Sequence, residues 1–157
     1  MDGSIRIMIV EDHPLFRRGL RTLLMSVPDF QVIGEADNGV DAVREAIALL
    51  PDIVLMDIQL PEQSGIASTR AIAASAPSVG VLMLTLFADD DSLFSALRAG
   101  ARGYVLKETD EEELVRAIRA VHRGDAIFGP AIASRVLAFF ANPRLGEQAP
   151  FPELTER

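Results

Sequence analysis

Four short apolar runs, each stopped by a polar residue, constrain the fold of this chain more than any other feature. The most informative run is Ile53–Met56, which ends at Asp57 and precedes a turn containing Pro61 and Gly65. A run of this length, bounded by turn residues, is typical of a strand buried on both faces. The other runs are Ile5–Val10, followed by Glu11 and Asp12; Val81–Leu84, followed by Thr85; and Tyr104–Leu106, followed by Lys107.

Segments with helical patterning separate these runs. Pro14 is well placed at a helix start, Asn38 can cap a second helix, and Gly100 can end a later one. Thr109, with Glu112 three residues on, forms a capping-box pattern. We expect the apolar residues at helical spacing in each segment to face the core. In the first two helices they are Leu15, Phe16, Leu20, Leu23, Leu24 and Val27, then Val40, Val43, Ile47 and Leu50.

Strands that alternate with helices predict a parallel sheet covered on both faces, with right-handed crossovers. With Phe30–Ala36 as a further strand, residues 4–124 hold five strands and five helices. We therefore expect an α/β, flavodoxin-like, doubly wound sheet of order 2-1-3-4-5. The first and third strands would then end side by side, so Glu11, Asp12 and Asp57 should face one another. A carboxylate at Asp57 could be solvated, hold a cation or act as a nucleophile.

Composition narrows the class of protein and its partners. The 157 residues are 49% hydrophobic and 24% charged, which is typical of a globular domain with a short appendage. Cysteine is absent, which excludes disulfides and thiolate metal sites. The net charge of −8 disfavours nucleic-acid binding by this segment alone. We found neither a signal peptide nor an apolar run near the roughly 20 residues of a membrane span, so we expect a cytoplasmic protein.

The pattern changes after residue 124. Residues 125–153 are expected to form a short extra helix, Ala131–Ala141, followed by a proline-containing linker. The helix carries the pair Phe139 and Phe140, which could fold back on the domain or join a dimer interface. Residues 154–157, Leu-Thr-Glu-Arg, are expected to be the first residues of a further domain that the chain does not contain.

These residues resemble the signature of a response-regulator receiver domain. Polar residues after strands one, three, four and five occupy the family's site positions, and the resemblance covers residues 4–124. The stretches Glu11–Leu20 and Gly100–Lys107, and the terminal Leu-Thr-Glu-Arg, are similar to the NarL/FixJ subfamily, which has a LuxR-type helix-turn-helix output domain. The resemblance implies a two-component switch that controls transcription rather than an enzyme. DNA would be bound only through the absent output domain.

The resemblance also implies a metal-dependent phosphorylation site. Asp57 would accept a phosphoryl group from a sensor histidine kinase. Mg²⁺, or Mn²⁺, would be bound by Asp12 and Asp57, by the backbone carbonyl of Gln59, and by Glu11 from further out. Clustered carboxylates suit such hard cations, which prefer oxygen ligands.

Three further residues would complete the switch that the resemblance implies. Lys107 would pair with the phosphoryl oxygens, and Thr85 would move to hydrogen-bond them. Tyr104 would change rotamer in step with Thr85, and phosphorylation would promote a homodimer or release the output domain. Leu86 departs from the family, whose members often carry a smaller residue there, and it could restrict access to the phosphoryl group. The sequence leaves the cognate kinase, the regulated genes and the dimer surface open.

Two other functions use similar residues. An aspartyl-phosphate phosphatase also has an aspartate after an apolar strand, but its acid/base aspartate two residues later is Gln59 here. A flavodoxin-like module for a nucleotide or flavin lacks support, because no glycine-rich phosphate loop follows the first strand. His13 lies beside these carboxylates and could bind the metal, but the simpler interpretation is that it stands at the start of a helix. Asp12 could also cap that helix.

Overall fold

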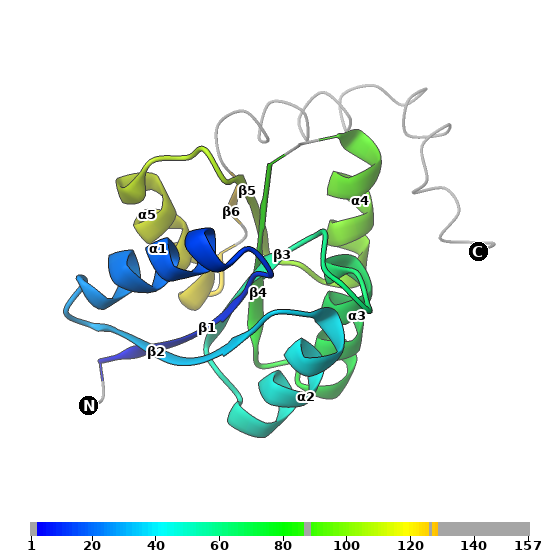
Figure 1. Cartoon of the computed structure of the whole chain (residues 1–157), viewed down its shortest axis with the longest axis horizontal. Coiled ribbons are helices and arrows are strands. Elements are labelled where there is room, and N and C mark those ends of the chain that lie inside the picture. Colours follow the sequence, from blue (N-terminus) through cyan, green and yellow to red (C-terminus); the bar gives the residue numbers. More distant parts are fainter. Residues whose placement is uncertain (1–2, 87–88, 126, 129–157) are drawn as a thin grey trace.

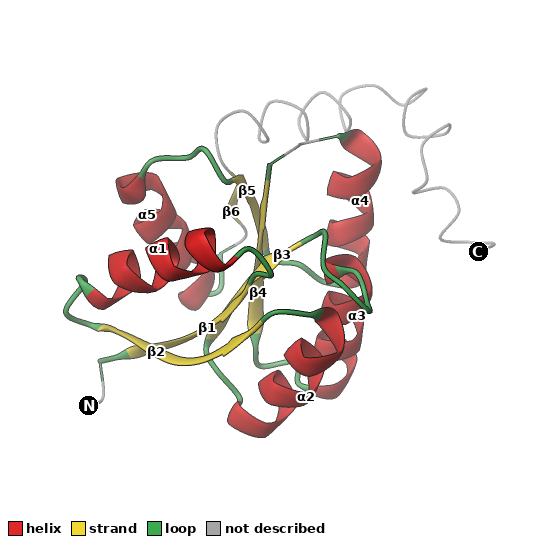
Figure 2. Ribbon diagram, viewed as in Figure 1, coloured by secondary structure: helices red, strands yellow, loops and turns green. Residues whose placement is uncertain are grey.

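A parallel sheet lies between two layers of helices in the computed structural model, which describes residues 3–86, 89–125 and 127–128 (Figures 1 and 2). The strands are β1 (Ile5–Val10), β2 (Phe30–Ala36), β3 (Ile53–Asp57), β4 (Gly80–Thr85), β5 (Gly103–Leu106) and β6 (Ile127–Phe128). The helices are α1 (Pro14–Met25), α2 (Gly39–Leu49), α3 (Gly65–Ser75), α4 (Asp90–Ala99) and α5 (Glu111–His122).

The order of the sheet confirms the predicted doubly wound topology. Within the described residues the strands run β2-β1-β3-β4-β5-β6, and every neighbouring pair is parallel. The order 2-1-3-4-5 was expected, whereas β6 was not. Two residues are too short to show a strand periodicity, and only their pairing with Gly103 and Tyr104 identifies them as a strand. The expected extra helix, linker and terminal Leu-Thr-Glu-Arg, from residue 129 on, lie outside the described residues.

The two faces of the sheet carry different helices. Helices α1 and α5 cover one face, and α2, α3 and α4 cover the other (Figure 1). Side chains alternate along a strand, so β1 sends Ile5, Ile7 and Ile9 into the first core and Met8 and Val10 into the second. Strand β3 is buried along its whole length, as its continuous apolar run predicted. The sheet is therefore enclosed, and its polar chemistry is confined to the strand ends.

The predicted core face of α2 was wrong for three of its four residues, and only Val43 packs against the core. Val40 and Ile47 are each 42% exposed and Leu50 is 50% exposed, whereas Ala42 and Ala46 are fully buried. Both sets recur at helical spacing, so the pattern alone could not choose between them. The small alanine side chains allow α2 to pack closely on the sheet, and the larger side chains then remain outside. Within α1, the predicted core residue Leu15 is likewise 69% exposed.

Helix starts follow the predicted chemistry with two corrections. Asn38 caps α2 as expected, because its side chain accepts a hydrogen bond from the backbone N–H three residues on. The cap of α1 is His13 rather than Asp12, and its Nδ1 accepts at 3.4 Å. The cap of α5 is Asp110 rather than Thr109. In both helices the observed cap is one residue later than the predicted cap. The side chain of Asp12 therefore does not cap α1.

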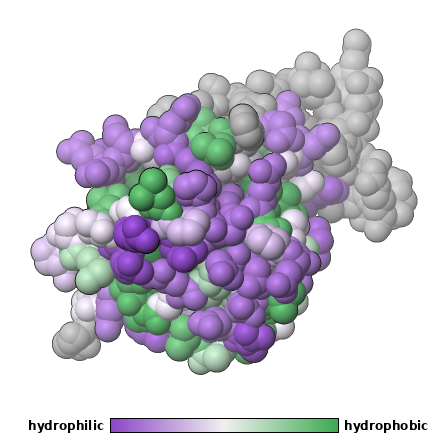
Figure 3. Space-filling model, viewed as in Figure 1, coloured by the Kyte–Doolittle hydropathy of each residue, from purple (hydrophilic) through white to green (hydrophobic). Residues whose placement is uncertain are grey.

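Hydrophilic side chains cover most of the viewed face, and hydrophobic groups are dispersed among them (Figure 3). This distribution agrees with the burial of most large apolar side chains between sheet and helices. None of the helices in the described part of the chain is long and apolar enough to cross a membrane.

Candidate functional site

The polar strand ends meet at one edge of the sheet, as the topology predicted. A cavity of about 520 Å³ lies there, and we call it the acidic crevice. Its lining combines residues that follow β1, β3, β4 and β5, which are far apart in the sequence. The lining residues are Glu11, Asp12, His13, Phe16, Asp57, Gln59, Thr85, Leu86, Lys107 and Glu108. Of the predicted site residues, the crevice therefore brings together all except Tyr104.

Asp57 is held at the end of β3 by the loop that follows it. The loop turns back so tightly that a Cβ atom at Gly65 would lie 2.0 Å from the backbone oxygen of Asp57. The N–H of Gly65 donates to the carbonyl of Ile58 at 2.7 Å, which closes the turn. Only a residue without a side chain fits at this position, so Gly65 fixes where the Asp57 carboxylate emerges. Asp57 is 7% exposed.

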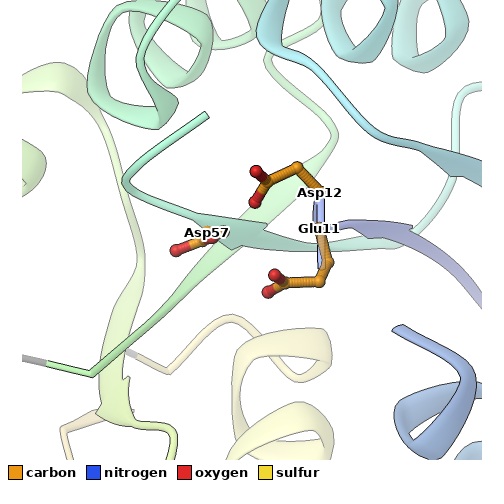
Figure 4. Close-up of side chains that lie close together, drawn as sticks. All are labelled: Glu11, Asp12 and Asp57. Carbon is orange, nitrogen blue, oxygen red and sulfur yellow. The ribbon is translucent and has the colours of Figure 1, made fainter. Parts of the chain in front are cut away.

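Three carboxylates converge in the crevice. Glu11, Asp12 and Asp57 each offer an oxygen, and these three oxygens lie within 4.8 Å of one another. The side chains of Glu11 and Asp12 both project toward Asp57 from the loop after β1 (Figure 4). Glu11 and Asp57 are buried and Asp12 is exposed. Such a cluster of oxygen ligands could hold a hard divalent cation.

Glu11 differs from Asp57 because both of its carboxylate oxygens have close partners, whereas the two contacts of the Asp57 oxygens are each 3.4 Å long. Oε1 lies 2.7 Å from the Nζ of Lys107, and Oε2 accepts a hydrogen bond from the backbone N–H of His13 at 3.0 Å. Arg17 also holds the backbone of Glu11, since its Nη1 donates to the Glu11 carbonyl at 2.8 Å. Glu11 therefore organises the site, while Asp12 and Asp57 remain better placed for direct contact with a cation.

Lys107 brings a positive charge among these carboxylates. Its Nζ lies 3.4 Å from Oδ2 of Asp57 in addition to its contact with Glu11. The Lys107 side chain is only 9% exposed, so its charge is poorly screened by water. The side chain is thus close enough to contact a group bound to Asp57.

Burial, and after it the negative charge of Glu11, raise the pKa of Asp57 from 3.8 to about 6. Lys107 and the N–H of Gln59, which donates to Oδ1 at 3.4 Å, act in the opposite direction. The positive charge of Lys107 therefore does not fully offset the effect of burial and of Glu11 on the pKa of Asp57. A bound divalent cation would supply the charge that is lacking.

Thr85 and Tyr104 lie on the same face of the sheet but at different depths. Thr85 ends β4, is 6% exposed and lines the crevice. Tyr104, in β5, pairs with Met83, two residues before Thr85, so their side chains point the same way. Tyr104 is completely buried in the core beneath α4. Both side chains therefore lie on the face of the sheet that α2, α3 and α4 cover.

Phe16 is a site residue that the sequence did not reveal. Its position in the apolar stripe of α1 indicated a core residue, and part of the ring does pack on the core. Its ring also lies beside Lys107, with Nζ 4.6 Å from the ring centroid. A helical stripe gives no sign that one of its members faces a distant lysine.

Comparison with known proteins identifies the family. The response regulator receiver domain model matches residues 7–119. LiaR, a transcriptional regulatory protein of Bacillus subtilis (strain 168), is 37% identical over 154 residues, which cover 98% of this chain and 72% of LiaR. YxjL, an uncharacterized transcriptional regulatory protein of the same strain, is 40% identical over 135 residues. That match covers 86% of this chain and 62% of YxjL, so the chain spans less than two thirds of this relative.

Solved structures agree with the sequence comparisons. A LuxR-family two-component response regulator from Aurantimonas sp. SI85-9A1 superposes with a TM-score of 0.84 at 37% identity. The superposition covers 88% of this chain and 99% of that one. The family match favours a receiver domain over the phosphatase and flavodoxin-like alternatives. It confirms the resemblance drawn from the strand-end residues. The chain belongs to the response regulator receiver family, and its relatives include LuxR-family regulators.

Proposed function

We propose that this receiver accepts a phosphoryl group on Asp57 in a Mg²⁺-dependent reaction, with the phosphohistidine of a sensor kinase as donor. The observation that carries the proposal is the convergence of Asp57 with Lys107 and two further carboxylates in one crevice. Asp57 is nearly buried yet lines the crevice, so a donor can reach it only from that opening.

The donor set fits Mg²⁺, with Mn²⁺ as a substitute, since both prefer oxygen ligands. Asp12 and Asp57 would hold the cation directly, together with the backbone carbonyl of Gln59. Glu11 would act from behind them, because Lys107 and the N–H of His13 occupy its oxygens. When bound, the cation neutralises charge on the phosphoryl oxygens and on the carboxylates.

The transfer itself requires little more than positioning. An ionised oxygen of Asp57 attacks the phosphorus atom in line, and the phosphorus–nitrogen bond of the donor breaks, with its electron pair returning to the imidazole. Lys107 exchanges part of its contact with Glu11 for a phosphoryl oxygen. The same residues take part in hydrolysis of the aspartyl phosphate, so the domain acts on itself and works as a switch rather than as a turnover enzyme.

The added charge is the signal. A doubly charged group on Asp57 offers new acceptors to Thr85 and Lys107. Movement of Thr85 would allow Tyr104 to change rotamer and would bias the surface formed by α4 and β5. We propose that this change forms a homodimer or releases an output domain. DNA would be bound, and transcription controlled, through that output domain. The cytoplasmic location expected from the sequence remains part of this proposal.

The experiment that tests the proposal is intact-mass analysis after incubation with acetyl phosphate and Mg²⁺. We expect the mass increase of one phosphoryl group, which disappears with Asp57→Asn and when EDTA removes the metal. Asp91→Asn serves as the matched control, because Asp91 is an exposed aspartate in the first turn of α4. Asp12→Asn should raise the Mg²⁺ concentration needed for half-maximal labelling. Undiminished labelling of Asp57→Asn would place the acceptor elsewhere and end the proposal.

A further inference from the structure

Phe16 separates the acidic crevice from a second hollow of the molecule. A cavity of about 460 Å³ lies between α1 and the start of α5, and Phe16, His13 and Lys107 line both it and the crevice. Lys107 extends along this partition to reach Glu11. The Phe16 ring is therefore part of the wall along which the reactive ammonium lies.

The contact between the ring and the ammonium is direct. The Nζ of Lys107 lies 4.6 Å from the centroid of the Phe16 ring, within the roughly 6 Å range over which an aromatic face attracts a cation. The ammonium also has Glu11 at 2.7 Å and Asp57 at 3.4 Å. Two carboxylates and one aromatic face thus surround the charge, and the side chain is 9% exposed.

A lysine in a phosphoryl-transfer site needs such support. Four flexible bonds connect its ammonium to the backbone, so its position is set by its surroundings rather than by its own geometry. Glu11 alone would hold the ammonium at the shorter of its two contacts, away from the group that arrives on Asp57. An aromatic face attracts the charge without fixing it at one point, because it offers no single acceptor atom. The ammonium can then move from Glu11 toward a phosphoryl oxygen while it keeps contact with the ring.

We propose that Phe16 is a positioning residue for phosphoryl transfer: its ring holds the Lys107 ammonium beside Asp57. The inference rests on the proposed function of Asp57. Phe16 offers no polar or ionisable group to the donor or to the phosphoryl group, so we assign its effect to its contact with Lys107. A ring that served merely as core packing would affect stability and leave the transfer step unchanged.

The kinetic test compares Phe16→Leu with Phe16→Tyr. Leucine keeps an apolar side chain but removes the aromatic face, whereas tyrosine keeps the face. We expect Phe16→Leu to lower the maximal rate of Asp57 labelling by acetyl phosphate about 2- to 30-fold, the equivalent of a cation–π contact of about 0.5–2 kcal/mol. The half-saturating donor concentration should change less than the maximal rate, and Phe16→Tyr should restore that rate.

Phe30 provides a matched control on the same core. Its ring lies 5.0 Å from the guanidinium of Arg119, and Phe30 is 7% exposed. Phe30→Leu removes an aromatic face from a cation outside the crevice, so it should cost stability without slowing the labelling of Asp57. If Phe30→Leu slows labelling as much as Phe16→Leu does, loss of packing explains both and the proposal fails.

A second measurement does not depend on phosphorylation. Lys107 is the only lysine in the sequence, so reductive methylation with ¹³C-formaldehyde gives one lysine signal besides that of the N-terminal amine, and the charge is retained. The ring should shift the lysine methyl signal upfield in the parent and in Phe16→Tyr, and the shift should vanish in Phe16→Leu. An unchanged signal in Phe16→Leu overturns the proposal. If the shift behaves as expected but Asp57 is never labelled, the proposed function fails while the contact stands.

Discussion

Removing the carboxylate of Asp57 should stabilise the metal-free domain, although it abolishes the proposed activity. Burial and the charge of Glu11 raise the pKa of Asp57 to about 6, against 3.8 for an ordinary aspartate. The ionised form is therefore less favourable in the native state than in the unfolded chain. Asp57→Asn keeps the shape of the side chain and an oxygen that can accept from the N–H of Gln59, but removes the charge.

The sign and size of the effect follow from proton linkage. Between pH 3.8 and about 6 the native state binds the additional proton, so the contribution of Asp57 to the free energy of unfolding falls as pH rises through that window. Above about pH 6 the native state carries the full free-energy cost of the buried charge on Asp57. A shift of about two pKa units corresponds to about 3 kcal/mol, and this is an upper value because Asp57 retains some access to water. At pH 5 about half of that cost remains.

Urea unfolding of the parent and of Asp57→Asn, in EDTA at pH 8 and pH 5, measures this contribution. We expect the variant to be more stable by up to about 3 kcal/mol at pH 8 and by about half as much at pH 5. Titrating groups distant from Asp57 are common to both proteins and cancel in the difference. Adding Mg²⁺ at pH 8 should stabilise the parent and reduce the advantage of the variant, because the cation binds the native carboxylates. A variant that is less stable than the parent at pH 8, or an advantage independent of pH, would refute the reasoning.

Two further predictions concern residues around the same carboxylate. Leu86 follows Thr85, lines the crevice and is 63% exposed. Leu86→Ala should admit water to the crevice and so shorten the lifetime of phosphorylated Asp57. Equal decay rates of the parent and the variant, followed by intact mass, would contradict this. Gly65→Ala should lower the free energy of unfolding by about 1–3 kcal/mol and impair labelling, because the new Cβ would meet the backbone of Asp57. Gly19→Ala is the control, since nothing lies near a Cβ there, and it should stabilise α1 by about 0.5–1 kcal/mol.

The sheet could be predicted from sequence because its signal is local and repeated. A continuous apolar run such as Ile53–Met56 has few interpretations other than a buried strand, and alternation with helices determines the parallel arrangement. The core face of α2 could not be predicted in the same way. Its alanines and its larger residues, Val40 and Ile47, recur at the same period, and only the packing distance to the sheet decides which set is buried. Strand β6 is too short to produce any pattern.

The same distinction applies to the site. Asp57 and Thr85 end their strands, and Glu11 and Lys107 directly follow theirs. Parallel strands bring their carboxyl ends to one edge, so topology alone predicts that these residues meet. Phe16 lies on a helix, where the sequence gives the direction of a side chain but not what it faces. Its role depends on the reach of the lysine side chain, which spacing along the chain does not encode.

The engagement of Glu11 explains how one acidic cluster can serve two purposes. If all three carboxylates were equivalent, a cation would draw on all of them and Lys107 would have no fixed place. Instead, one oxygen of Glu11 contacts Lys107 at 2.7 Å and the other accepts from the N–H of His13 at 3.0 Å. In the proposed mechanism Glu11 and the Phe16 ring together hold the ammonium 3.4 Å from Asp57 before a phosphoryl group arrives, and Asp12, which is exposed, is left to bind the cation. Glu11→Gln should therefore disturb Lys107 more than it disturbs metal binding, with a larger loss in the maximal labelling rate than in Mg²⁺ affinity.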